Sequence, residues 1–220
     1  MKKRLVPDII TPNKITTFRM ICVGLLVFIL LFPWGYFNVN LSGGNDEINF
    51  QYLIAFILFV IASLSDYFDG HLARKYNMVS NFGKFMDPIA DKLLVNSSFI
   101  ILMVQGENKF RVLPIIVVIM ISRDIIVDVI RMLAVEQGKV IPANIWGKLK
   151  TVLQMIALIA IFGCNAMVNF MDNSLINFFG IFCLILSCLA AIASFMSGIV
   201  YISKSLFLFV DKKDEKKEEE

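Results

Sequence analysis

The sequence predicts an all-α, polytopic membrane protein with six transmembrane helices and both termini in the cytoplasm. Of its 220 residues, 58% are hydrophobic and 18% are charged, and the mean hydropathy is +0.74. Soluble domains are closer to half apolar and a quarter charged. The charges here gather between apolar runs long enough to cross a bilayer, which takes about 20 residues. Six runs meet this length, with boundaries at 15–33, 51–73, 83–105, 112–136, 149–168 and 175–209.

The first of these runs is expected to remain as a transmembrane helix. Residues 1–4 are mostly basic, but the polar, proline-containing sequence after them offers no small-residue cleavage site of a secretory signal. We therefore expect three parts. A cytoplasmic or interfacial segment covers 1–14, a six-helix transmembrane domain covers 15–209, and a charged, disordered tail covers 210–220.

Lysine and arginine are distributed unevenly between the runs, and this bias predicts the orientation. The segments 34–50 and 169–174 contain neither residue. Basic residues precede the first run and separate the second from the third and the fourth from the fifth, and only Lys109 and Arg111 oppose this trend. The bias predicts a multi-pass protein of the cell membrane with both termini inside. No aromatic and basic pattern indicates nucleic-acid binding.

Four aspartates interrupt the apolar pattern in the stretch SDYFDGHLARKYNMVSNFGKFMDPIADKLL, residues 65–94. Asp66 and Asp69 are three residues apart, and Asp87 and Asp91 are four apart, so each pair lies on one face of a helix. The nine residues KYNMVSNFG between the two acidic segments predict an antiparallel helical hairpin. In such a hairpin the two acidic faces meet on the cytoplasmic side.

Facing carboxylates near hydrocarbon repel one another and are costly to ionise. A hard divalent cation relieves both penalties, and a site with only oxygen ligands suits Mg²⁺, Mn²⁺ or Ca²⁺. Four acids are enough to hold two ions, an arrangement that clamps both sides of a phosphoryl displacement. The sequence therefore predicts a divalent metal site on these helices.

Small residues accompany the aspartates at Gly70, Ala73 and Gly83. They predict close helix packing, room for a nucleotide or phosphate to approach the backbone, or both. Arg74 could grip a phosphate or extend its charge to the membrane interface. Pro88 removes a helical hydrogen bond and is predicted to bend the start of the third helix.

The pattern D-x2-D-G-x2-A-R-x8-G-x3-D-x3-D resembles the signature of the CDP-alcohol phosphatidyltransferase family at all specified positions. The whole chain also fits the six-helix membrane core of that family. The resemblance implies an enzyme that displaces CMP from a CDP-linked lipid, CDP-diacylglycerol, with an alcohol acceptor. It further implies two bound Mg²⁺ or Mn²⁺ ions and, by analogy, a homodimer in the membrane lipid.

The resemblance also implies roles for individual residues. Asp66, Asp69 and Asp87 would bind metal, and Asp91 would bind metal and act as the general base on the acceptor hydroxyl. The implied CDP-binding set is Asn13, Thr16, Asp66, Asp69, Gly70, Ala73, Arg74 and Gly83.

The acceptor is predicted from flanking segments. TPNKITTFRM at 11–20 and IWGKLKTVLQM at 145–155 resemble bacterial phosphatidylglycerophosphate synthases, one branch of the family, although a capped helix start and a basic loop would look similar. Several cations near the cytoplasmic side would suit any acceptor that carries its own phosphate. The resemblance of the two flanking segments then favours sn-glycerol 3-phosphate as this acceptor. The candidate acceptor-phosphate residues are Arg19, Arg123, Arg131, Lys148 and Lys150.

Several alternatives stay open at this point. Arg123 adjoins Asp124 and could form an intramembrane ion pair, and Arg131 could extend to the interface. Inositol phosphate also carries a phosphate, and phosphatidylglycerol as acceptor would give cardiolipin. Two other functions are also considered: an intramembrane prenyltransferase, in which aspartates would bind Mg²⁺ and a diphosphate, and a cation transporter, in which they would line the path of the ion. The four cysteines have no metal-ligand spacing and are expected to be small buried apolar residues.

Overall fold

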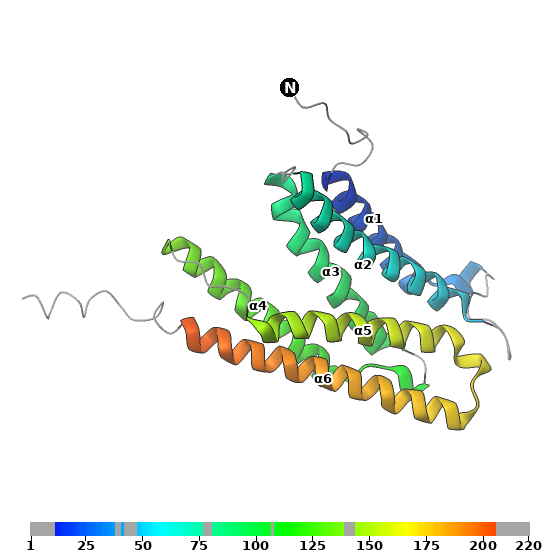
Figure 1. Cartoon of the computed structure of the whole chain (residues 1–220). Coiled ribbons are helices and arrows are strands. Elements are labelled where there is room, and N and C mark those ends of the chain that lie inside the picture. Colours follow the sequence, from blue (N-terminus) through cyan, green and yellow to red (C-terminus); the bar gives the residue numbers. More distant parts are fainter. Residues whose placement is uncertain are drawn as a thin grey trace, which may run out of the picture. The chain divides into compact units, whose positions relative to one another are not determined.

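The computed structural model describes residues 12–37, 41, 48–76, 81–106, 108–138 and 144–205. Within these ranges the chain forms six α-helices and three short 3₁₀ helices, with no β-strand (Figure 1). Side chains of 12–15, 35, 37, 66–76, 81–85 and 108 lie outside the described part. The elements are α1 (Pro12–Leu31), η1 (Trp34–Phe37), α2 (Phe50–Tyr76), α3 (Asn81–Gln105), η2 (Asn108–Phe110), α4 (Pro114–Glu136), α5 (Ile145–Met167), η3 (Val168–Phe170) and α6 (Asn173–Ser205).

The all-α prediction is confirmed for the described residues, because each of the six apolar runs coincides with one α-helix. Among the residues that the structure describes, two segments are long and apolar enough to cross a membrane, Ile145–Phe170 and Asn173–Ser205. The apolar parts of α1 and α2 are shorter, at Thr16–Leu31 and Phe50–Ser65. The count of six spans and the location of the termini therefore stay predictions.

The chain divides into two compact units. The first contains Met1–Val112 and Met155–Leu184, and thus α1, α2, α3, the second part of α5 and the first part of α6. The second contains Leu113–Gln154 and Ile185–Glu220, and thus α4, the first part of α5 and the last part of α6.

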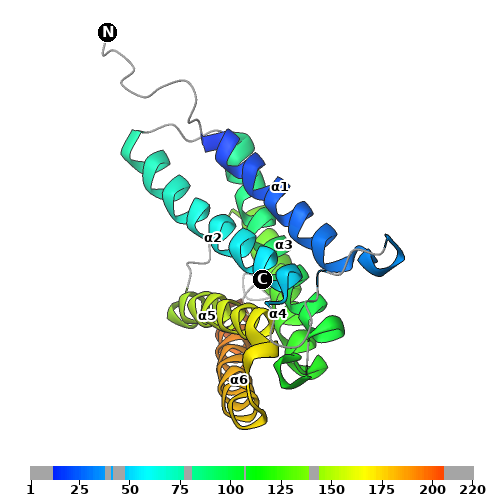
Figure 2. The same ribbon diagram turned by 90° about the vertical axis from the view of Figure 1, so that its right-hand side faces the viewer.

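In the first unit, α1 packs against both α2 and α3 (Figure 2). The apolar part of its buried face runs from Cys22 to Leu30 at helical spacing. Side chains satisfy the carbonyls at the end of α1, which the helix itself leaves unpaired. Trp34 Nε1 donates to the Ile29 carbonyl at 2.9 Å, and Gln51 Nε2 donates to the Leu30 carbonyl at 2.9 Å. The end of α1 is therefore closed by its neighbours in the sequence and by α2.

The buried face of α2 consists of Tyr52, Ala55, Phe59 and Ala62, which recur every three or four residues. The ring of Phe59 lies 5.5 Å from that of Phe162 on α5. Helix α3 continues through Pro88 despite the lost backbone donor. The bend predicted there stays a prediction.

In the second unit, α4 begins at Pro114, a residue suited to the first helical turn because that turn leaves its N–H groups unpaired anyway. Asn144 stands just before α5 and its Oδ1 accepts the N–H of Gly147 at 2.6 Å. This is the geometry of an N-cap, which fixes where α5 begins. The last part of α6 has a buried face of small residues, including Ala190, Ser194 and Ser197, that allows close packing.

All four cysteines lie in the described part of the chain, and none of them forms a disulfide. Many large apolar side chains on α6 are exposed, and they include Ile185, Ile192, Phe195 and Ile199. A soluble monomer rarely exposes so much contiguous apolar surface, whereas lipid covers it at no cost. The exposed surface therefore agrees with a membrane-associated protein.

Candidate active site

Two side chains of α1 bind two of the predicted metal-ligating aspartates on α3. Thr16 Oγ1 donates to Asp87 Oδ1 at 2.7 Å. One turn further along α1, Arg19 Nη1 forms an ion pair and hydrogen bond with Asp91 Oδ1. We call these four residues the α1–α3 polar bridge. It joins two helices of the first unit at the end that carries the aspartates.

The helical register explains how the polar bridge forms. Thr16 and Arg19 are three residues apart and lie on the same buried face as Leu26, so the polar pair continues an apolar contact surface. Asp87 and Asp91 are four residues apart on α3 and therefore also share a face. The contact between α1 and α3 thus brings two donors opposite two acceptors.

Burial in the polar bridge is uneven. Thr16 and Arg19 are fully buried, at 0% exposure, while the side chain of Asp91 is 40% exposed. Asp87 is half-buried. A buried guanidinium requires a counter-charge, and Asp91 supplies it. The donors are enclosed by the protein, and the carboxylate of Asp91 remains accessible from one side.

The other predicted site residues of this region lie in α1, α2 and α3, but their side chains are outside the described residues. No group of three His, Cys, Asp or Glu side chains able to hold a metal occurs among the side chains that are described. The predicted site residues whose side chains lie outside the described part are Asn13, Asp66, Asp69, Gly70, Ala73, Arg74 and Gly83. Of the predicted ligands, Asp87 and Asp91 fit a hard cation by their carboxylate oxygens, their shared face and the accessibility of Asp91.

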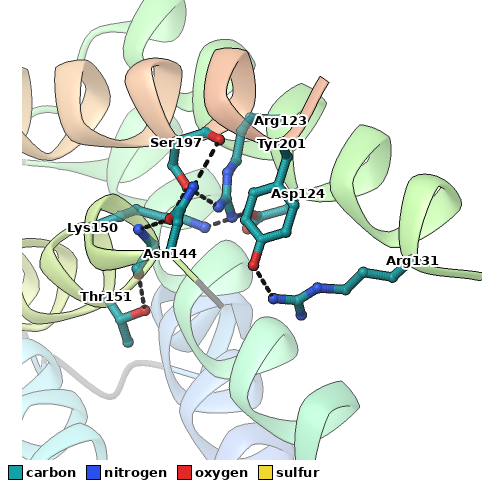
Figure 3. Close-up of polar contacts among 9 residues, drawn as sticks. Arg123, Asp124, Arg131, Asn144, Lys150, Thr151, Ser197 and Tyr201 are labelled. Carbon is teal, nitrogen blue, oxygen red and sulfur yellow. Dashed lines mark hydrogen bonds and ion pairs between the residues drawn. The ribbon is translucent and has the colours of Figure 1, made fainter. Parts of the chain in front are cut away.

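The second unit contains a buried cationic cluster, made of Arg123, Asp124, Asn144, Lys150 and Ser197 (Figure 3). Asp124 Oδ1 on α4 accepts hydrogen bonds from Arg123 Nη1 at 3.0 Å and from Lys150 Nζ on α5. The exposed side-chain fractions are 13% for Arg123, 7% for Asp124 and 7% for Lys150. Two cations and one carboxylate leave this cluster with a formal excess of one positive charge.

Polar groups of α5 and α6 complete the cationic cluster (Figure 3). Arg123 Nη2 donates to Ser197 Oγ, and Ser197 Oγ donates to Asn144 Oδ1 at 3.0 Å. Asn144 therefore caps α5 and links to α6 at the same time. Space is limited close by, because a Cβ at Gly198 would lie 3.1 Å from Cγ of Arg123. The absence of a side chain there allows the stem of Arg123 to lie against α6.

Arg131 and Lys148 differ from the buried cations. Arg131 Nη2 donates to the hydroxyl of Tyr201 on α6 at 2.6 Å, and its guanidinium lies 5.1 Å from the centre of that ring. Lys148 is exposed on α5. Residues 147, 150 and 154 follow the buried face of α5, so the register separates Lys148 from Lys150 although only one residue lies between them.

The structure brings two of the predicted acceptor-phosphate residues together and adds polar residues that the sequence had not indicated. Arg123 and Lys150 share one carboxylate, and the ion pair of Arg123 with Asp124 is also present. Sequence reasoning assigned no function to Asn144, Ser197 or Tyr201. A signal existed for Asn144, since Asn three residues before glycine at a helix start predicts an N-cap. Ser197 and Tyr201, four residues apart in an apolar helix, carried only a weak signal.

Comparisons with known proteins identify relatives over most of the chain. The family model described as CDP-alcohol phosphatidyltransferase matches residues 9–193. A CDP-diacylglycerol–glycerol-3-phosphate 3-phosphatidyltransferase of Bacillus subtilis (strain 168) is 42% identical over 153 residues, which is 68% of this chain and 75% of that protein. A protein with the same description from Mycoplasma genitalium is 38% identical over 197 residues, which is 86% of this chain and 80% of that protein.

The match covers most of the chain and includes α1, α2, α3, α4 and α5, with both the polar bridge and most of the cationic cluster. The matched range also contains the whole aspartate-containing stretch 65–94. The apolar helices agree with a membrane-associated enzyme. The chain belongs to the CDP-alcohol phosphatidyltransferase family.

Proposed function

We propose that this protein transfers the phosphatidyl group of CDP-diacylglycerol to sn-glycerol 3-phosphate, with phosphatidylglycerophosphate and CMP as products. The observation that carries the proposal is the similarity to relatives described by this reaction, one of which matches 86% of the chain. The buried excess of positive charge around Arg123 and Lys150 supports an acceptor that carries its own phosphate.

Asp66, Asp69, Asp87 and Asp91 are the proposed ligands of two divalent ions, Mg²⁺ or Mn²⁺. Bound there, such ions neutralise a diphosphate and stabilise the charge that develops on the leaving CMP. Asn13, Thr16, Gly70, Ala73, Arg74 and Gly83 are the further residues proposed to line the CDP site. Thr16 donates to Asp87, so we propose that it contributes to this site through that carboxylate and not by touching the substrate.

Asp91 is the proposed general base. The accessible carboxylate accepts the proton of the acceptor hydroxyl as the hydroxyl oxygen attacks the β-phosphorus of CDP-diacylglycerol. A phosphorus–oxygen bond forms to the acceptor, the bond to the CMP oxygen breaks, and CMP leaves with the bonding electrons. The ion pair with Arg19 holds the Asp91 carboxylate in one orientation during this step.

We assign the phosphate of the acceptor to Arg123 and Lys150, with Arg131 and Lys148 as weaker contributors. Arginine and lysine donate charge-assisted hydrogen bonds to phosphate, and burial strengthens them. Arg19 is not included in this set, because its fully buried guanidinium pairs with Asp91. Asp124 would keep the two cations together before the acceptor arrives.

The protein is proposed to cross the cell membrane six times, with both termini and the active site at the cytoplasmic side. The distribution of lysine and arginine supports this orientation. A homodimer is proposed by analogy with the family.

The decisive experiment measures CMP release by the full-length protein purified in detergent, with CDP-diacylglycerol and Mg²⁺ or Mn²⁺. Separate reactions receive sn-glycerol 3-phosphate, inositol 1-phosphate, phosphatidylglycerol or serine. We expect release with sn-glycerol 3-phosphate alone. Release with a different acceptor would overturn the proposed acceptor and retain the reaction class. Folded protein that released no CMP with any acceptor would overturn the proposed activity and favour a transporter.

A further inference from the structure

The α1–α3 polar bridge carries an inference about Thr16 and Arg19 that differs from substrate binding. Both residues lie on one buried face of α1, and each donates to a different aspartate of α3. We propose that Thr16 and Arg19 are positioning residues, which hold the carboxylates of Asp87 and Asp91 in the orientation needed to bind metal. This inference rests on the proposed metal site.

The difference in burial between donors and acceptors supports this role. The side chain of Arg19 is 0% exposed and that of Asp91 is 40% exposed, so the contact has a closed side on α1 and an open side on α3. A ligand that arrives from the open side meets the carboxylates first. Thr16 and Arg19 therefore act on that ligand through the aspartates that they bind.

The hydrogen bonds restrict the carboxylates in a useful way. Both contacts use Oδ1 of the aspartate, which limits rotation about the bond to the carboxylate group. Partners that orient metal-binding carboxylates commonly change metal affinity by about 10- to 100-fold when they are removed. Two donors from one helix also fix both carboxylates relative to a single rigid element, and rigid elements give more accurate sites than loops.

Charge gives a second reason. Several carboxylates close together repel one another in the absence of cations. A buried guanidinium on α1 offsets one of these charges permanently and cannot be lost by deprotonation. Arg19 thus allows α1 and α3 to pack together before metal binds.

The test uses full-length protein in detergent and measures Mn²⁺ affinity from the electron paramagnetic resonance signal of free Mn²⁺. Thr16→Val removes the hydroxyl donor and keeps a side chain of similar shape. We expect its Mn²⁺ affinity to fall about tenfold and kcat to fall with it, while KM for the acceptor does not change. Thr17→Val is the matched control, because Thr17 is the next residue on α1 and is exposed.

Arg19 is tested with Arg19→Lys and Arg19→Gln. The lysine variant keeps the charge but not the planar donor, and we expect it to retain more Mn²⁺ affinity than the glutamine variant. If Arg19→Gln does not fold, the Thr16→Val result still decides the proposal, because threonine and valine differ little in size. Thermal unfolding with and without Mn²⁺ gives an independent readout, in which Thr16→Val should gain less stability from the ion than the wild type.

Three results would overturn the inference, and they are distinct. Wild-type Mn²⁺ affinity in Thr16→Val, together with a raised KM for CDP-diacylglycerol, would make Thr16 a substrate contact. Equal losses in Thr16→Val and Thr17→Val would indicate a general disturbance of α1. Absence of Mn²⁺ binding by the wild-type protein would remove the proposed metal site itself, and the positioning role with it.

Discussion

The α1–α3 polar bridge and the cationic cluster are both ionic groups enclosed by apolar helices, and they differ in how accessible their carboxylates are. Asp91 pairs with a fully buried arginine yet is 40% exposed. Asp124 is 7% exposed and accepts from two cations. The carboxylate of the first group is partly exposed, whereas that of the second is enclosed together with the two cations that it binds.

This difference shows that buried charge alone does not indicate whether a carboxylate is accessible to a ligand or is already enclosed by its cationic partners. The polar bridge presents an oriented acceptor to the outside. The cationic cluster is balanced internally except for one positive charge, and its partners lie on α4, α5 and α6. Burying such cations unpaired would be costly, and Asp124 supplies their counter-charge.

The largest expected effect concerns the accessible carboxylate. Asp91→Asn removes the proposed base and a metal-binding oxygen charge, and we expect kcat to fall by about 10³-fold, since general base catalysis contributes about 10² to 10⁴. The assay is CMP release, with thermal unfolding to verify the fold. Asp172→Asn is the control, because Asp172 is exposed just before α6. Near-wild-type turnover of Asp91→Asn would refute the assigned role.

The next effect tests whether the cationic cluster needs its counter-ion. Asp124→Asn keeps the shape but leaves Arg123 and Lys150 without a charged partner, so the free energy of unfolding should fall by about 3 kcal/mol. Added sn-glycerol 3-phosphate should raise the unfolding temperature more in this variant than in the wild type. An equal rise in both proteins would argue that Asp124 does not compete with the phosphate.

A smaller effect is expected from one cation of the cluster. Lys150→Met removes a buried charged donor worth about 2 kcal/mol, so KM for sn-glycerol 3-phosphate should rise about 30-fold, with KM for CDP-diacylglycerol unchanged. Lys204→Met serves as the control, since Lys204 is exposed in the last turn of α6. Parallel changes in both KM values would contradict an acceptor-specific role.

The smallest effect concerns the space that Arg123 occupies. Gly198→Ala places a Cβ 3.1 Å from Cγ of Arg123, which would displace the arginine stem at a cost of about 1 kcal/mol. KM for the acceptor should rise roughly fivefold, because about 1.4 kcal/mol corresponds to tenfold. Gly24→Ala, where nothing lies within 4 Å, should leave KM unchanged. A similar effect of both substitutions would refute the packing argument.

Much of the fold could be predicted because hydropathy and length determine where long helices occur. The predicted run 83–105, for example, coincides with α3 at Asn81–Gln105. The spacing of Asp87 and Asp91 placed them correctly on one helix face. These features depend on residues close together in the sequence, which is the range over which periodicity carries information.

The partners of these residues could not be predicted in the same way. Thr16 and Asp87 are 71 residues apart, and their contact depends on α1 packing against α3. From the sequence, Thr16 was assigned to the CDP site and Arg19 to the acceptor phosphate. Hydroxyl and basic side chains can bind either a phosphate or a carboxylate, and the sequence does not show which group lies opposite them. Lys148 and Lys150 looked equivalent until the register of α5 separated an exposed lysine from a buried one.

The length of α6 predicts that the activity of this protein depends on the thickness of the bilayer. Its 33 residues measure about 50 Å, whereas the hydrocarbon layer is about 30 Å thick. The excess is accommodated by inclination of the helix or by extension into the headgroup region, at a cost that changes with lipid chain length. Ser197 and Tyr201, which bind Arg123 and Arg131, lie in the final turns of this helix. Lipids with longer or shorter chains should therefore shift the acceptor affinity of an enzyme that itself makes membrane lipid.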